Sequence, residues 1–130
     1  MVVDTSALLA ILLGEPEAEA AIEALAADPR RWVSAFSVYE AAVVIDGRKG
    51  PAGGRELDLL LHEAGVTVVP FTAEHAGLAR EAYRRFGKGH HPAGLNLGDC
   101  AAYALAQDSG EPLLFKGDDF RRTDVESVLG

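Results

Sequence analysis

Short apolar runs alternate along the chain with longer stretches in which apolar and polar residues follow a helical spacing. The apolar runs have the length of buried strands, and they occupy residues 1–3, 32–33, 66–69 and 113–115. The intervening stretches predict helices over residues 6–13, 16–27, 37–45, 53–64, 72–86 and 96–109. Short strands separated by helices indicate an α/β fold, in which helices flank both faces of a short central, mostly parallel sheet.

Glycine, proline and capping residues set the expected ends of these helices. Thr72 and Asn96 are typical N-cap residues. Gly14 and Gly110 follow helices, where glycine tolerates a left-handed backbone. The segment 47–51 (GRKGP) is expected to end the third helix. No internal repeat or long linker interrupts the alternation, so residues 1–130 are expected to form a single domain.

The charge balance restricts the classes of partner. The chain has 12 Lys and Arg against 20 Asp and Glu, a formal net charge of −8. This argues against a nucleic-acid binder that relies on charge alone, but not against a nuclease whose acids surround metal ions. A single cysteine, Cys100, excludes a disulfide framework and a CxxC zinc site. The charge-free stretch from Thr5 to Gly14 is too short to span a bilayer and is not preceded by a basic residue, so we expect a cytoplasmic protein.

Acidic residues follow the predicted strands. Asp4 comes directly after the first strand, Glu40 lies early in the helix after the second, and Asp99 lies in the first turn of the sixth helix. Asp118 follows the last strand, with Asp119 beside it. The carboxyl ends of parallel strands meet at one edge of a sheet, so these acids can converge although they span the chain.

Each acid also has a purely structural explanation. Asp4 suits an N-cap, the Ser37–Glu40 and Asn96–Asp99 spacings suit capping boxes, and the pair 118–119 suits a turn. As a set, however, carboxylates crowded beside apolar residues repel one another unless a cation lies among them. Oxygen ligands without His or Cys partners favour Mg²⁺ or Mn²⁺ over zinc.

Four motifs resemble, in this order, those of the PIN-domain ribonucleases, and more closely those of the VapC toxins of bacterial type II toxin–antitoxin systems. They are the opening VVDTSAL (2–8), the helix that carries Glu40, LNLGDC (95–100) and LLFKGDDF (113–120). The resemblance extends from Met1 to about Val125. It implies a PIN-like three-layer fold and a Mg²⁺-dependent endoribonuclease that hydrolyses RNA phosphodiester bonds, with Mn²⁺ as a substitute cation.

The resemblance also implies roles for single residues. Asp4 and Asp99 match the principal metal-ligating aspartates of the family. Glu40 matches the catalytic acid that shapes the metal site and orients or activates the attacking water. The fourth catalytic acid is assigned to Asp118, with Asp119 as the alternative. The expected products carry a 5′ phosphate and a 3′ hydroxyl.

The partners implied by the resemblance are an RNA substrate, a VapB-like antitoxin and a second copy of the chain. RNA requires basic groups around the acids, and the candidates are Arg48, Lys49, Arg80, Arg84, Arg85, Lys88, Lys116, Arg121 and Arg122. An antitoxin helix requires exposed apolar surface, and the candidates are Leu8, Leu9, Leu12, Leu13, Ile22 and Leu25. The alternative is that all of these apolar residues face the sheet.

Two other functions share parts of this pattern. A PIN-fold binding module that has lost activity would not need all four acids. An aspartyl-phosphate phosphatase or a phospho-receiver domain would place a nucleophilic Asp after the first strand, as Asp4 is placed. The phosphatase requires a second Asp where Ser6 stands, and the receiver requires paired acids ahead of its nucleophile, whereas none precedes Asp4. The pattern therefore favours the ribonuclease.

Overall fold

Four short parallel strands form the centre of the fold in the order β3-β2-β1-β4. The computed structural model describes every residue from Met1 to Gly130. The strands are β1 (Val2–Val3), β2 (Trp32–Ser34), β3 (Thr67–Val69) and β4 (Leu113–Leu114). The α/β class and the parallel sheet expected from the sequence are confirmed.

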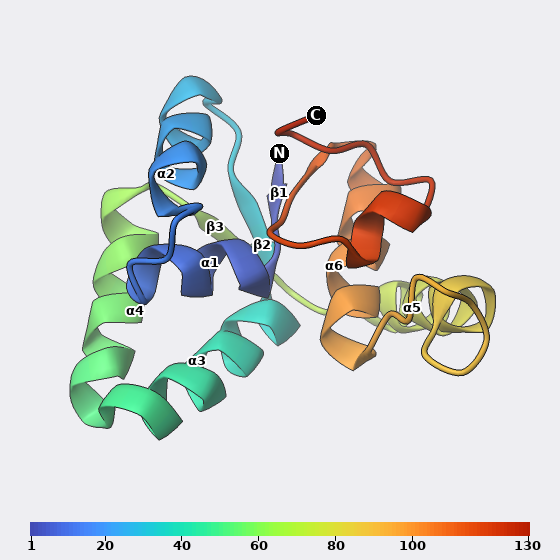
Figure 1. The fold of residues 1–130 in the computed structure, drawn as a ribbon, viewed down its shortest axis with the longest axis horizontal. Coiled ribbons are helices and arrows are strands. Elements are labelled where there is room, and N and C mark those ends of the chain that lie inside the picture. The colour runs from blue at the N-terminus through green and yellow to red at the C-terminus, as the bar shows by residue number, and fades with distance from the viewer.

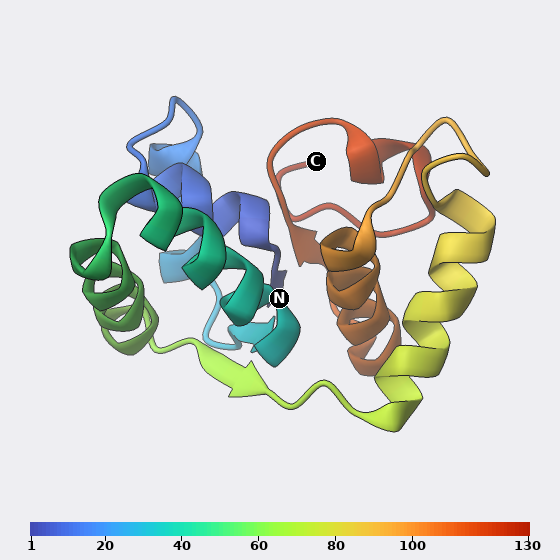
Figure 2. The same ribbon diagram turned by 90° about the horizontal axis from the view of Figure 1, so that it is seen from below.

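Helices cover both faces of this sheet, which gives the expected three layers (Figure 1). One face is covered by α1 (Thr5–Leu12), α2 (Ala18–Ala27), α3 (Ala35–Lys49) and α4 (Pro51–Glu63). The other is covered by α5 (Ala73–Phe86), α6 (Leu97–Ser109) and, after β4, the short 3-10 helix η1 (Asp119–Arg122). Figure 2 shows these two groups as separate lobes, with β3 and its flanking segments running between them.

Each face of the sheet has its own hydrophobic core because side chains alternate along the strands. Val2 and Leu113 belong to the core that includes residues of α5 and α6. Val3 and Leu114 belong to the core that includes residues of α1, α2 and α4. All four side chains are fully buried. Both residues of β1 are thus enclosed, and Asp4 directly follows a fully buried strand.

Most of the expected helix ends agree with the structure. Thr72 and Asn96 cap α5 and α6, and Gly110 ends α6 with a φ of 70°. The break expected at 47–51 is placed too early, because α3 continues through Gly47 to Lys49 and ends at Gly50, whose φ is 64°. Arg48 and Lys49 lie in the last turn of α3, where the negative end of the helix dipole stabilises cationic side chains. They therefore favour the continuation of the helix. None of the helices has the length and apolarity that a membrane crossing requires.

Candidate active site

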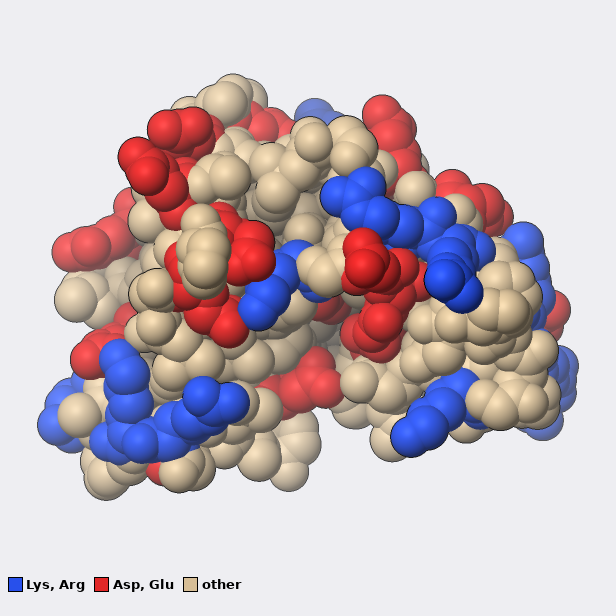
Figure 3. All heavy atoms as spheres, viewed as in Figure 1, with Lys and Arg blue, Asp and Glu red and all other residues tan.

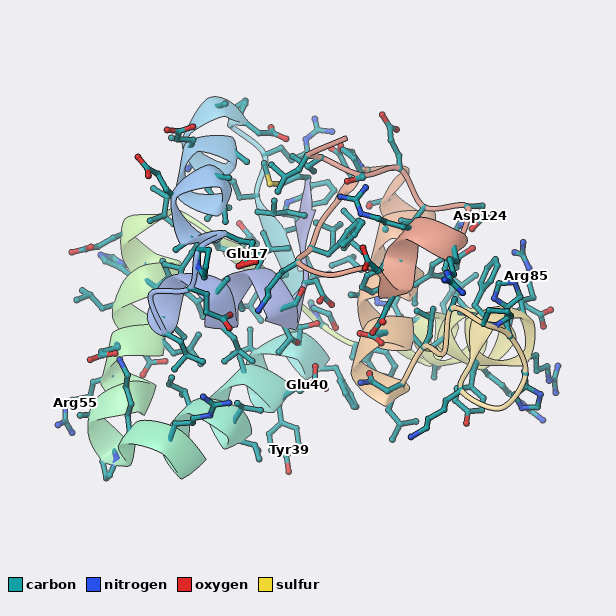
Figure 4. The ribbon with its side chains drawn as sticks, in the orientation of Figure 1. Glu17, Tyr39, Glu40, Arg55, Arg85 and Asp124 are labelled. Atoms are coloured by element: carbon teal, nitrogen blue, oxygen red, sulfur yellow. The ribbon has the colours of Figure 1, made fainter.

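Asp4, Glu40 and Asp99 line one cleft of about 180 Å³. Asp4 follows β1 as the N-cap of α1, Glu40 lies on α3, and Asp99 lies in the first turn of α6. Figure 4 shows Glu40 at the end of α3 nearest α6, whereas its neighbour Tyr39 points away into solvent. The fold therefore brings together three acids that lie far apart in the sequence, as the parallel topology predicted.

The side chain of Asp4 is almost completely buried, at 2% exposure. Its Oδ2 accepts hydrogen bonds from the Ser6 N–H at 3.0 Å and from the Ser6 hydroxyl at 2.6 Å. Its Oδ1 is buried without any donor. Burial raises the pKa of Asp4 to about 7 against the lowering effect of the Ser6 hydrogen bonds, and the charges of Asp99 and Glu40 add to the rise. A buried carboxylate oxygen without a hydrogen-bond donor, such as Asp4 Oδ1, is stabilised by any cation that reaches it.

Asp99 has both a structural and an electrostatic role. It forms the predicted capping box with Asn96: Asn96 Oδ1 accepts from the Asp99 N–H at 2.9 Å, and Asp99 Oδ2 accepts from the Asn96 N–H at 3.1 Å. This box occupies only one of the two carboxylate oxygens of Asp99. Burial raises the pKa of Asp99 to about 6, and the charges of Asp119 and Glu40 contribute to the rise.

Glu40 has no capping role. Helix α3 begins directly after β2, and its N-cap is Ser34, whose hydroxyl accepts from the Phe36 N–H at 3.2 Å. The capping box expected from the Ser37–Glu40 spacing is therefore wrong, because Ser37 already lies inside the helix, where its hydroxyl is buried without a partner. The half-buried Glu40 side chain does not cap its own helix, and it lines the cleft instead.

The two candidates for the fourth acid are placed differently. Asp118, the first choice from the sequence, is 93% exposed and forms an ion pair with Arg121 at 3.6 Å. Asp119 begins η1, and its charge is among the causes that raise the pKa of Asp99, whereas that of Asp118 is not. Neither residue lines the cleft itself. Of the two, only Asp119 acts electrostatically on an acid of the cleft, Asp99.

The donor set of the cleft fits a hard divalent cation. It offers carboxylate and hydroxyl oxygens, with no His or Cys, and the buried Asp4 Oδ1 lacks a donor. No group of three or more His, Cys, Asp or Glu side chains has a geometry that could hold a metal ion alone. Mg²⁺ in proteins keeps several waters and is usually bound by one or two carboxylates. Asp4 and Asp99 together satisfy that requirement.

No Lys or Arg side chain lines the cleft, and the basic candidates lie elsewhere on the surface. Figure 3 shows Lys and Arg gathered on the corner formed by α3 and α4 and on the side of η1, with Asp and Glu between them. Some of the basic candidates already form ion pairs within the chain: Lys49, Arg84, Arg85, Lys116 and Arg121. The others are exposed and form no ion pair: Arg48, Arg80, Lys88 and Arg122. The second group is available to an anionic ligand.

A larger hollow of about 530 Å³ lies beside the cleft. Its lining is apolar and aromatic with two arginines: Phe36, Phe71, Ala76, Ala79, Arg80, Tyr83, Arg84, Leu97 and Cys100. Phe36 precedes Glu40 by one helical turn on α3, and Leu97 precedes Asp99 on α6. The hollow and the cleft therefore share the same two helices. Aromatic faces next to arginines are typical of surfaces that bind nucleic-acid bases.

Sequence reasoning overlooked Gly98, which directly precedes Asp99. A Cβ atom at Gly98 would overlap both carboxylate oxygens of Glu40. The sign that could have revealed Gly98 in the sequence is a glycine at the second position of a predicted helix. Alanine would favour the helix more at that position, so a glycine there needs another reason.

Comparisons with known proteins point to one family. The PIN domain model matches residues 1–126. A "Ribonuclease VapC" of Mycolicibacterium smegmatis is 59% identical over 128 residues, which cover 98% of this chain and 99% of that protein. "Ribonuclease VapC30" of Mycobacterium tuberculosis is 56% identical over 128 residues, covering 98% of each chain. The crystal structure of the Mycobacterium tuberculosis toxin VapC20, described as cleaving the sarcin–ricin loop, superposes with a TM-score of 0.78 at 19% identity and 95% coverage of both chains.

Proposed function

The chain belongs to the PIN-domain family and, within it, to the VapC ribonucleases, and from this membership we propose that it is the ribonuclease toxin of a type II toxin–antitoxin system, active with a divalent cation. One observation supports the catalytic part of the proposal most strongly. Three acids from distant parts of the chain line one cleft, and the buried Asp4 Oδ1 there lacks a donor. Such a cleft suits the hydrolysis of RNA phosphodiester bonds by an activated water.

In this proposal Asp4 and Asp99 hold Mg²⁺, with Mn²⁺ as a substitute. The bound cation supplies positive charge that polarises the scissile phosphate and lowers the pKa of a water. Asp4 is held for this task by Ser6, and Asp99 by Asn96. Both carboxyls have a raised pKa, so the protein brings them together at a free-energy cost that the cation relieves.

Glu40 acts on the attacking water. Its carboxylate lines the cleft and its charge acts on both aspartates, so it is close to the reacting groups. We assign it the acceptance of the proton that the water loses on attack. Asp119, which is coupled to Asp99, takes the place of the fourth acid in this scheme.

In this proposal the RNA backbone is bound by exposed cations that form no ion pair within the chain. Arg48, Arg80, Lys88 and Arg122 are exposed, and no carboxylate of the chain competes for them. Arg80 also lines the aromatic hollow next to the cleft, together with Phe36 and Tyr83. An unstacked base in that hollow would lie beside a phosphate bound by the arginine.

We place the antitoxin on the groove between α2 and α4. This groove has a volume of about 330 Å³ and is lined by Ile22, Leu25, Ala26, Arg31, Leu60, Glu63 and Ala64. Of the apolar candidates, Leu8 and Leu25 are buried in the core, whereas Ile22 remains 50% exposed. An apolar groove with an exposed isoleucine suits the apolar face of an amphipathic helix.

A homodimer would cover a different surface. Tyr39 and Val43 lie one turn apart on α3 and are 68% and 56% exposed, and Leu97 is 75% exposed. We propose that a second copy covers these side chains. Light scattering coupled to size-exclusion chromatography measures whether the purified protein is a dimer.

Cleavage of a mixed RNA pool by the purified protein in Mg²⁺ tests the activity. We expect cleavage that requires both the cation and Asp4, so a chelator and the Asp4→Asn variant each abolish it. A folded protein that binds Mg²⁺ but cleaves no RNA in the pool would favour a PIN-fold binding module. Stable labelling of Asp4 by acetyl phosphate would instead identify a phosphoryl-transfer protein.

A further inference from the structure

Gly98 and Glu40 meet where the first turn of α6 packs against α3. Gly98 is buried at the second position of α6, directly before Asp99. A Cβ atom built on its backbone would overlap Oε1, Oε2 and Cδ of Glu40, closer than Cβ atoms approach any neighbour in real proteins. The Glu40 carboxylate therefore occupies the space that any other side chain at position 98 would take.

We propose that Gly98 is a positioning residue: its missing side chain leaves the slot in which the Glu40 carboxylate lies beside Asp4 and Asp99. The inference rests on the proposed function, because it explains how one acid of that site is held. Gly98 itself touches no reacting atom and acts through Glu40.

The backbone gives no other reason for a glycine at this position. Gly98 is not among the glycines with a positive φ, so an alanine could adopt its conformation. The helix start does not need it either, because Asn96 and Asp99 already form a complete capping box. Glycine is also a poor helix former compared with alanine. What the position requires is space for Glu40.

The slot offers Glu40 a favourable environment despite its two anionic neighbours. The first turn of α6 carries the partial positive charge of the helix dipole, which stabilises a carboxylate placed against it. Glu40 also acts electrostatically on both Asp4 and Asp99, so from this slot it reaches both aspartates. A carboxylate moved out of the slot would lose the helix dipole and its closeness to the pair.

An alanine at position 98 would displace Glu40 and leave the fold intact. The atoms that a new Cβ meets are the far end of a flexible side chain on another helix, and that end can swing away while the backbone stays in place. We expect Gly98→Ala to unfold at the same temperature as the original protein or higher, since alanine favours the helix. A purely structural role for Gly98 predicts a lower unfolding temperature.

The experiment compares Gly98→Ala, Glu40→Ala and the double variant with the original protein. Two quantities are measured for each: the rate of RNA cleavage, and the Mg²⁺ concentration that produces half of the metal-induced rise in unfolding temperature. Gly77→Ala is the matched control, because Gly77 is also a helical glycine but has nothing within 4 Å of the added Cβ.

We expect Gly98→Ala to lower the cleavage rate and weaken Mg²⁺ binding by about 10- to 100-fold, the usual effect of losing a residue that orients a metal site. In the Glu40→Ala background the same change should have no further effect on Mg²⁺ binding, because the slot is then empty. Gly77→Ala should match the original protein.

Equal Mg²⁺ binding and cleavage by Gly98→Ala and the original protein would overturn the positioning role and leave the ribonuclease proposal standing. A loss of Mg²⁺ binding that is as large without Glu40 as with it would also overturn that role. If the original protein itself neither binds Mg²⁺ nor cleaves RNA, both proposals fail.

Discussion

The hydroxyl of Ser6 donates a hydrogen bond to Oδ2 of Asp4 at 2.6 Å. The same hydroxyl oxygen accepts from the backbone N–H of Lys116, just beyond β4, at 2.9 Å. One small side chain thus links the buried acid to the segment that leads to Asp119. Asp4 is the N-cap of α1 and Ser6 lies inside the helix, so the Ser6 hydroxyl acts as a link between the two segments.

Ser6→Ala should therefore affect the fold and the site together. It removes a donor from Asp4 and leaves the Lys116 N–H without its acceptor, so we expect the free energy of unfolding to fall by about 1–3 kcal/mol. The pKa of Asp4 should rise further, because the Ser6 hydrogen bond lowers it, and Mg²⁺ binding should need a higher pH. Denaturant unfolding and Mg²⁺ titration at several pH values measure both effects. Ser109→Ala is the control: its hydroxyl donates to Leu105 O at 2.7 Å outside the cleft, so it should leave the pH dependence of Mg²⁺ binding unchanged.

The metal-free protein should lose stability as the pH rises. The pKa values of Asp4 and Asp99 are raised from 3.8 to about 7 and about 6, so the folded state holds protons that the unfolded chain has already released. Between about pH 4 and pH 7 the unfolded state binds fewer protons, and stability therefore falls with pH, by about 1.4 kcal/mol for each unit by which a pKa is raised.

Asp4→Asn tests this directly, because the amide resembles the protonated acid. In the presence of a chelator, its unfolding temperature should exceed that of the original protein at pH 8 and match it more closely at pH 5. Mg²⁺ should stabilise the original protein more at pH 8 than at pH 5, since the cation binds the deprotonated acids. A variant with the same loss of stability between pH 5 and pH 8 as the original would show that Asp4 does not hold the proton.

Asp118 and Asp119 should respond differently to the same substitution. Asp119→Asn removes a charge that raises the pKa of Asp99, so it should lower that pKa. It should also reduce RNA cleavage, because Asp119 is the fourth acid of the proposed site. Asp118→Asn removes only an exposed ion pair with Arg121 and should change stability by less than about 1 kcal/mol, with cleavage unaffected. Cleavage rates of the two variants decide the assignment. A large loss in Asp118→Asn alone would restore the choice made from the sequence.

Arg80→Ala should weaken RNA binding and its dependence on salt. If Arg80 contacts one phosphate of a single strand, the slope of log affinity against log salt should fall by about 0.7. Binding is measured with an Asp4→Asn protein, which does not cleave the RNA, over a range of salt concentrations. Arg55→Ala is the comparison, since Arg55 is an exposed cation on α4 far from the cleft (Figure 4). Equal slopes for the two variants would remove Arg80 from the RNA-binding surface.

Ile22→Asp should release the protein from its antitoxin. The substitution places a charge in the apolar groove between α2 and α4, and Ile22 is exposed enough for the fold to tolerate it. RNA cleavage alone should be unchanged, whereas inhibition by the antitoxin should be lost. Leu59→Asp changes an equally exposed residue of α4 that does not line the groove, and it should remain inhibited. The opposite pattern would place the antitoxin on the other face of α4.

Local chemistry was enough to predict most of the elements. The caps at Thr72 and Asn96 and the left-handed Gly110 depend only on neighbouring residues, and they agree with the structure. Gly47 misled the prediction because glycine is tolerated inside an exposed helix, and the true stop is Gly50, where φ is positive. The Ser37–Glu40 spacing suggested a helix start at Ser37, but β2 ends at Ser34, and Ser34 is the N-cap of α3. The spacing of residues within a helix does not show where the preceding strand ends.

The site depended on contacts between distant segments. Parallel topology predicted that Asp4, Glu40 and Asp99 could meet, and they line one cleft. The choice between Asp118 and Asp119 depends on the direction of two adjacent residues around η1, which the sequence leaves open. The slot at Gly98 is defined by a side chain of another helix, so a glycine before an aspartate carries no visible sign of it.

The pairing of β1 with β4 orders events during translation. The Asp4 N–H donates to Leu114 O at 2.9 Å, so the first strand has its final neighbour only after the ribosome has added the residues of β4. Asp99 is also made late. A nascent chain therefore contains Asp4 long before it contains Asp99 or Leu114. A growing or prematurely released fragment therefore lacks the assembled cleft. The cell that makes this protein meets its activity only after the residues of β4 have been added.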